Sequence, residues 1–185
     1  VSPVPAACAT GLVAEVYQRL EDDMGVLVPS VALHSPAPRT LAASWVLMRE
    51  TLVVDGLVDR DTSEAVATVV SKANMCAYSA DLHTMILEAL ARSQDEDPAN
   101  DQRIARIAHW ARSSARADTA RGHGTPFLAG HMAELVGTVV TFHYFNRMAS
   151  VFLPEHLRPP GVPKAAWGLT LRLLGSLMES ASRKE

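Results

Sequence analysis

The sequence predicts an all-α protein. Apolar residues recur at helical spacing in segment after segment, and no segment alternates with the period of two that marks a half-buried strand. Glycine and proline separate these segments, as is typical of helix ends. With 185 residues, 48% hydrophobic and 20% charged, the chain is long enough to bury a full core. We therefore expect about six helices in one domain over residues 1–185, with its core at about 10–155.

The first helix is expected over residues 9–20, where the apolar residues share one helical face. Gly25 should end this segment as a C-cap, and Pro29 should prevent an early restart. A second helix is expected from about 39 to 54, and Gly56 closes it.

A third helix is expected to begin with Asp61 or Thr62 as its N-cap, because both side chains can accept a backbone N–H. Glu64 then falls in the first turn, where the helix dipole favours a negative charge. The pattern reaches Asn74 and resumes after Cys76, with an apolar face formed by Leu82, Met85, Ile86 and Leu90.

Three more helices are expected in the second half, at about 98–117, 126–152 and 164–182. The acidic segment SQDEDPAND, the turn-rich RGHGTP and the proline-rich LPEHLRPPGVP should form the connections. Residues 127–145 are the most apolar, but His131, Glu134 and His143 interrupt them. This segment therefore fails as a membrane span and is predicted to be a buried core helix.

Composition and charge exclude several classes of protein. Seventeen basic and twenty acidic residues give a formal charge of −3, which leaves no overall basic footprint for nucleic acid. The beginning, VSPVPAACAT, has no basic region and no long apolar run, so we expect no signal peptide. Cys8 and Cys76 make no disulfide framework, and the cytoplasm is the expected compartment. His131, Glu134 and His143 match no metal-binding pattern, so we expect neither a metal nor a cofactor.

The stretch NMCAYSADLHTM, residues 74–85, carries the candidate chemistry. Cys76, Ser79 and His83 are spaced i, i+3 and i+7, which places them along one helix face. Glu64 stands twelve residues before Cys76 and can face it if the chain bends near Asn74. A carboxylate, an imidazole and a thiol together can relay protons. The spacing alone favours a small buried thiol and a satisfied histidine with no catalytic role.

Glu64, followed after a dozen residues by CAYS and then His83-Thr84, resembles the motif of the alkylhydroperoxidase (AhpD-like) and carboxymuconolactone decarboxylase superfamily. That motif runs Glu, about a dozen residues, then C-x-x-C-x-x-x-H. The flanks HSPAPRTLAASWVLMRETLVVDGLVDRDTSEAV and TVVTFHYFNRMASVF are similar to peroxidase-related members. The resemblance covers about residues 10–155 and implies an AhpD-like helical bundle, assembled as a homo-oligomer of trimeric or hexameric units. It also implies a small-molecule substrate, with Tyr78 as a contact to it.

The sequence departs from the family at Ser79. In AhpD-like peroxidases two cysteines cycle between dithiol and disulfide, and the cysteine at this position is the attacking thiol. A serine hydroxyl is hardly ionised at neutral pH and forms no disulfide. The two-thiol cycle is therefore closed to this chain. The resemblance still implies an oxidoreductase that acts on a peroxide or a related small molecule, with a thiol reductant as partner. Cys76 is then the remaining thiol, His83 the base or acid, Glu64 the relay carboxylate, and Ser79 a hydrogen-bonding partner.

Two other functions stay open at this point. One is a lyase or isomerase in the style of carboxymuconolactone decarboxylase, in which Glu64 and His83 move protons on a bound carbonyl or lactone. The other is a catalytically silent helical scaffold that keeps these residues for packing. It is equally open whether Ser79 is native or was introduced in place of a cysteine.

Overall fold

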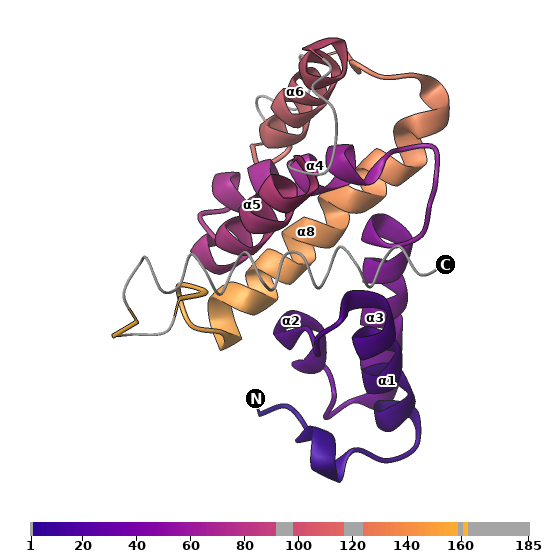
Figure 1. Cartoon of the computed structure of the whole chain (residues 1–185), viewed down its shortest axis with the longest axis vertical. Helices are drawn as coiled ribbons and strands as arrows, with labels where there is room; N and C mark the ends of the chain where they lie inside the picture. The colour runs from indigo at the N-terminus through magenta and orange to yellow at the C-terminus, as the bar shows by residue number, and fades with distance from the viewer. Residues whose placement is uncertain (1, 92–97, 117–123, 159–160, 163–185) are drawn as a thin grey trace.

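The computed structural model describes residues 2–91, 98–116, 124–158 and 161–162, and within these ranges every regular element is a helix (Figure 1). The all-α prediction is therefore confirmed. The helix expected at 164–182 lies outside the described residues. The elements are η1 (Ala6–Cys8), α1 (Leu12–Met24), α2 (Pro29–Ala32), α3 (Pro38–Leu52), α4 (Arg60–Ala73), α5 (Ala77–Ala91), α6 (Pro98–Ser113), η2 (Ala129–His131) and α8 (Met132–Phe152).

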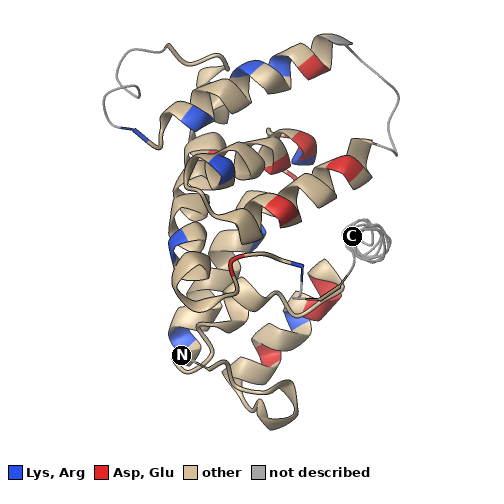
Figure 2. Cartoon of the chain, turned by 90° about the vertical axis from the view of Figure 1, so that its left-hand side faces the viewer, with Lys and Arg blue, Asp and Glu red and all other residues tan. Residues whose placement is uncertain are grey.

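The long helix α8 is the centre of the arrangement, with α4 and α5 beside it, α6 packed on α4, and α1, α2 and α3 toward its other side (Figure 1). Its buried face supplies the large side chains Leu135, Phe142 and Phe145 to the core. No described helix is both long and apolar enough to span a membrane. In the described part of the chain, basic and acidic residues are spread over several helices (Figure 2).

Helices α4 and α8 run parallel, which two sets of hydrogen bonds show. Near the start of both helices, Glu134 accepts from the N–H groups of Leu57 and Val58, at 3.1 and 2.9 Å. Near the end of α4, Ser71 Oγ donates to Asn146 Oδ1 at 3.1 Å. Polar contacts at both ends fix how far α4 can slide along α8, and therefore where its first turn lies against the core.

Several helix boundaries differ from the sequence prediction: α1 begins at Leu12 rather than at residue 9, α3 ends at Leu52 rather than near 54, and α6 ends at Ser113 rather than near 117. Pro29 does not prevent a helix but begins the short α2, because proline at the first helical position lacks only an N–H that would be unpaired anyway. The last long helix begins at Met132 rather than near 126, after the 3-10 turn η2. The predicted end of α1 is confirmed, since Gly25 adopts a left-handed φ of 72° as its C-cap.

The N-cap of α4 is Asp59, and the prediction of Asp61 or Thr62 was wrong. Asp59 Oδ1 accepts from Thr62 N at 2.8 Å and from Thr62 Oγ1 at 2.7 Å. Arg103 of α6 contacts the other carboxylate oxygen. Burial alone would raise the pKa of Asp59, but the hydrogen bonds from Thr62 and the charge of Arg103 together lower it below its ordinary 3.8. This cap holds the first turn of α4, which contains Glu64.

Asp59→Ala is expected to reduce the free energy of unfolding by about 1–2 kcal/mol, because the cap of α4 is lost. Asp59→Asn keeps an acceptor oxygen and should lose less. A carboxyl whose folded pKa is lowered stabilises the fold above its unfolded pKa, and that stability is lost as the pH falls through the folded pKa. Urea unfolding should therefore separate wild type from Asp59→Asn at pH 7 and bring the two together in acid. Identical midpoints for wild type and Asp59→Ala at pH 7 would show that the cap contributes nothing.

Candidate active site

A tight turn between α4 and α5 folds the two helices against each other. Met75 has a left-handed φ of 55° and is 90% exposed, so its side chain packs on nothing at this bend. Cys76 N then donates to Ser71 O at 3.0 Å, and Cys76 O accepts from Ala80 N at 3.0 Å. Cys76 thus stands directly before the first turn of α5. The bend expected near Asn74 is present, and it turns α5 back along α4.

The turn brings the carboxylate of Glu64 to the imidazole of His83. His83 Nδ1 donates to Glu64 Oε2 at 2.7 Å, and the two residues are 5% and 0% exposed. The edge of the imidazole meets the Phe142 ring at a centroid distance of 4.5 Å, which fixes its plane. An ionised carboxylate only accepts hydrogen bonds, so Nδ1 carries the hydrogen and Nε2 keeps its lone pair. In this arrangement His83 can act as a base at Nε2.

Cys76 and Ser79 form a second pair. Cys76 Sγ donates to Ser79 Oγ at 3.4 Å, and both residues are buried. Cys76 stands at the N-terminus of α5, the end of a helix that carries partial positive charge. Burial raises the pKa of the neighbouring Tyr78 hydroxyl, and the charge of Cys76 raises it further. Among the described residues, no hydrogen bond joins this pair to the Glu64–His83 pair.

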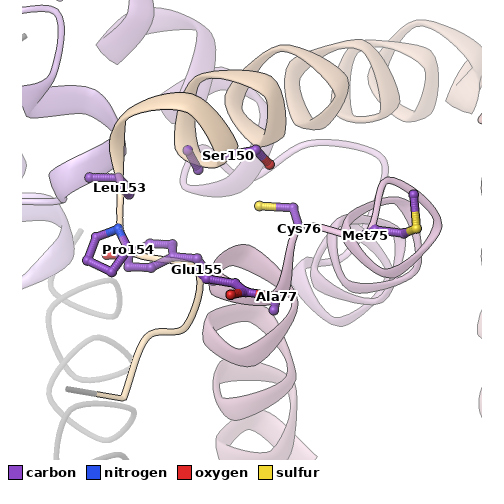
Figure 3. A pocket seen from close by; sticks show the side chains of 9 residues that line it. Met75, Cys76, Ala77, Ser150, Leu153, Pro154 and Glu155 are labelled. Atoms are coloured by element: carbon purple, nitrogen blue, oxygen red, sulfur yellow. The ribbon is translucent and has the colours of Figure 1, made fainter. Parts of the chain in front are cut away.

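Cys76 and His83 line different cavities. A cavity of about 360 Å³ is lined by Cys76, with the end of α8 on its far side (Figure 3). In Figure 3 the sulfur of Cys76 points toward Ser150 and Leu153, whereas Met75 points away. A second, mainly apolar cavity of about 20 Å³ lies beside Ser79 and His83. Tyr78 lines both cavities and so separates the thiol side from the imidazole side.

Arg60 is a site residue that the sequence analysis missed. Its Nε lies 3.8 Å from Glu64 Oε1, one helical turn away on α4. All three guanidinium nitrogens are buried, and none has a hydrogen-bond partner among the described residues. The available signal was the i, i+4 spacing of an arginine and a glutamate, which places both on one helix face.

The three residues considered as metal ligands do not come together. Glu134 binds backbone N–H groups before α4, whereas His143 contacts Asn74 Nδ2 and Ser114 Oγ, each at 3.0 Å. His131 stands at the start of α8. The described part of the chain contains no group of three or more side chains that could hold a metal ion.

Comparisons with known proteins agree with this architecture, although no known family model matches the chain. The alkyl hydroperoxide reductase Rv2159c of Mycobacterium tuberculosis (strain ATCC 25618 / H37Rv) is 36% identical over 172 residues, which cover 89% of this chain and 48% of the relative. The chain therefore spans about half the length of this curated relative.

Two crystal structures share the fold. An uncharacterized peroxidase-related protein with an AhpD core, from Ralstonia eutropha JMP134, superposes with a TM-score of 0.61 at 20% identity, covering 95% of this chain and 96% of that one. An uncharacterized peroxidase-related protein from Silicibacter sp. TM1040 gives a TM-score of 0.57 at 18% identity, covering 81% and 88%. The similarity in sequence to this relative and the helical fold shared with these two structures support the resemblance of the chain to the AhpD-like superfamily.

Proposed function

We propose that this chain reduces peroxides in the manner of an AhpD-like enzyme, with Cys76 as its one active-site thiol. The observation that carries the proposal is the position of this thiol: it lines a cavity of about 360 Å³ at the start of α5. His83 lies further along the same helix, and it is paired with the buried Glu64 of α4. A thiol, a base and room for a small molecule are what peroxide reduction by cysteine requires.

The proposed reaction begins with proton transfer away from Cys76. Ser79 accepts the hydrogen of Sγ, and its own hydroxyl hydrogen passes toward His83, which lines the same small cavity. The Glu64 carboxylate stabilises the imidazolium that forms. The thiolate attacks one peroxide oxygen, so an S–O bond forms while the O–O bond breaks. The leaving oxygen takes the proton back from His83 by way of Ser79 and departs as an alcohol, and Cys76 is left as a sulfenic acid.

Completion of the cycle needs a thiol from outside the pair, because Ser79 cannot close a disulfide with Cys76. A first external thiol condenses with the sulfenic acid, which releases water and forms a mixed disulfide. A second external thiol attacks that disulfide, so Cys76 returns as a thiol and the reductant leaves as its own disulfide. The larger cavity gives both the peroxide and the reductant access to Cys76, with Tyr78 as the proposed substrate contact.

The test of this proposal is the reactivity of Cys76, with Cys8 as an internal control because it is exposed and distant in sequence. We expect Cys76 to be alkylated by a small reagent as a thiolate, faster than Cys8 below pH 9 despite its burial. Peroxide consumption with a thiol reductant should be lost in Cys76→Ala and kept in Cys8→Ser. A folded protein in which Cys76 is unreactive below pH 9 would rule out a one-cysteine peroxidase.

A second candidate is acid–base chemistry without redox, as in a lyase or isomerase. The observation that favours it is the separation of the two cavities, since His83 and Ser79 line one in which Cys76 takes no part. On this hypothesis Cys76→Ala keeps the activity, and the measurement is hydrogen exchange from solvent into the carbon next to a substrate carbonyl. A silent scaffold is expected to show neither peroxide turnover nor hydrogen exchange.

We also propose that the protein is a homo-oligomer, as a trimer or hexamer. A row of apolar side chains at intervals of four residues lies partly exposed on α8, formed by Met132, Val136, Val140 and Tyr144. Exposed apolar rows of this kind mark association surfaces. Light scattering should give a mass well above the 19.9 kDa of one chain, and Val140→Lys should lower it. A monomer at micromolar concentration would contradict this assembly.

A further inference from the structure

Arg60 is a largely buried cation whose guanidinium group makes no hydrogen bond with the described residues. It is the first residue of α4, its side chain is 18% exposed, and its guanidinium nitrogens have no hydrogen-bond partner in the described part of the chain. Its nearest carboxylate oxygen is Glu64 Oε1, at 3.8 Å, which itself accepts no hydrogen bond. Removing a cation from water without hydrogen bonds is costly, so what Arg60 contributes is its charge at this place.

We propose that Arg60 is a positioning residue that keeps Glu64 ionised and His83 neutral, with the free lone pair on His83 Nε2. The reason is the net charge of the buried groups Arg60, Glu64 and His83. With His83 neutral, the positive Arg60 and the negative Glu64 cancel. One more proton on His83 would leave a net positive charge among buried groups, which a poorly solvated site disfavours. Without Arg60, the remaining pair has zero net charge when His83 is protonated and Glu64 is ionised.

The other charged groups around Arg60, Glu64 and His83 either oppose the effect of Arg60 on His83 or are already paired. From the end of α3, the following loop and α8, three carboxylates line a small cavity together with Arg60: Glu50, Asp55 and Glu134. They are more exposed than Glu64, so solvent screens them more strongly. If the charge of Arg60 were absent, their negative potential would further favour a proton on His83. On α6, Arg103 is engaged by Asp59. On α5, Tyr78 is a titratable residue that lines the same cavity as His83.

This inference rests on the proposed function, in which neutral His83 is the base, but its test does not require turnover. The His83 imidazole is followed by NMR over pH in wild type, Arg60→Met and Arg60→Lys, with its signal assigned by its absence in His83→Gln. Arg60→Met should move the midpoint of the His83 titration upward by about one pH unit or more. Arg60→Lys, which restores the charge, should leave it near the wild-type midpoint. If Arg60→Met does not fold, Arg60→Gln carries the same expectation with a polar side chain.

In the peroxidase assay, the acidic limb of the rate profile should move upward in Arg60→Met by the same amount, because a base with a higher midpoint stays protonated to higher pH. An unchanged His83 midpoint in a folded Arg60→Met or Arg60→Gln overturns the role of Arg60, whatever the activity. A shifted midpoint with no peroxide turnover in any variant supports Arg60 and defeats the proposed peroxidase function instead.

Discussion

Glu64→Gln and His83→Gln are each expected to remove most of the activity, by a factor of about 10²–10⁴, which is the usual contribution of general acid–base catalysis. Glutamine keeps the size of Glu64 but not the charge that stabilises a protonated His83, and His83→Gln removes the base itself. Because the two side chains share one hydrogen bond of 2.7 Å, the double variant should lose little more than either single variant. The measurement is initial rate against pH for the three variants.

Glu64→Gln carries a second expected effect, on stability. It leaves the buried guanidinium of Arg60 without its negative partner at 3.8 Å. The matched control is Arg60→Met in the Glu64→Gln background, which removes the uncompensated cation and should recover part of the lost stability. Urea unfolding of the single and double variants separates this loss from the loss of catalysis. Full activity in a folded Glu64→Gln, His83→Gln double variant would show that neither side chain takes part in the reaction.

Ser79→Cys is expected to raise peroxide consumption by at least about tenfold, equivalent to about 1.4 kcal/mol in the barrier. The substitution is nearly isosteric, so its packing cost should be small. The new sulfur would stand where Ser79 Oγ now lies, 3.4 Å from Cys76 Sγ, and a disulfide can close because Cys76 precedes the regular part of α5. The new thiol would be deprotonated through His83, attack the peroxide, and be resolved by Cys76.

Peroxide consumption with a dithiol reductant measures this gain, and mass spectrometry should show a loss of two hydrogens on oxidation. The control is the same substitution in Cys76→Ala, which keeps the new thiol but cannot form the disulfide. If Ser79→Cys yields neither a disulfide nor a gain in rate, the pocket serves other chemistry. The lyase or isomerase hypothesis would then become the leading one.

The helices could be predicted from the sequence because they depend on regular spacing. The contact of Glu64 with His83 crosses the turn between α4 and α5, and the sequence predicted only that Glu64 could face Cys76. Spacing could not choose the N-cap of α4, since Asp59, Asp61 and Thr62 all have capping side chains. That choice involves Arg103, 44 residues further along the chain, on a helix that packs on α4. Contacts of this kind come from tertiary structure.

The candidate site shows the same limit. An i, i+3, i+7 pattern correctly places Cys76, Ser79 and His83 along one helix, but it does not tell which cavity each side chain enters. The end of α8 forms the wall of the thiol-side cavity, and nothing near residue 76 in sequence indicates it. Arg60 was missed for a related reason, because burial of its guanidinium becomes visible only once α4 is packed.

The length of the turn at Asn74 and Met75 is as much a requirement of the site as any side chain. Each residue of an α-helix turns the next by about 100°, so one residue inserted before Cys76 would leave α5 either displaced or rotated by that angle. His83 would then face away from Glu64, although every residue of the motif was still present. Insertions and deletions between residues 64 and 83 should therefore be selected against even where substitutions are accepted. Among related chains, the count of residues between the glutamate and the histidine would then vary less than the residues themselves.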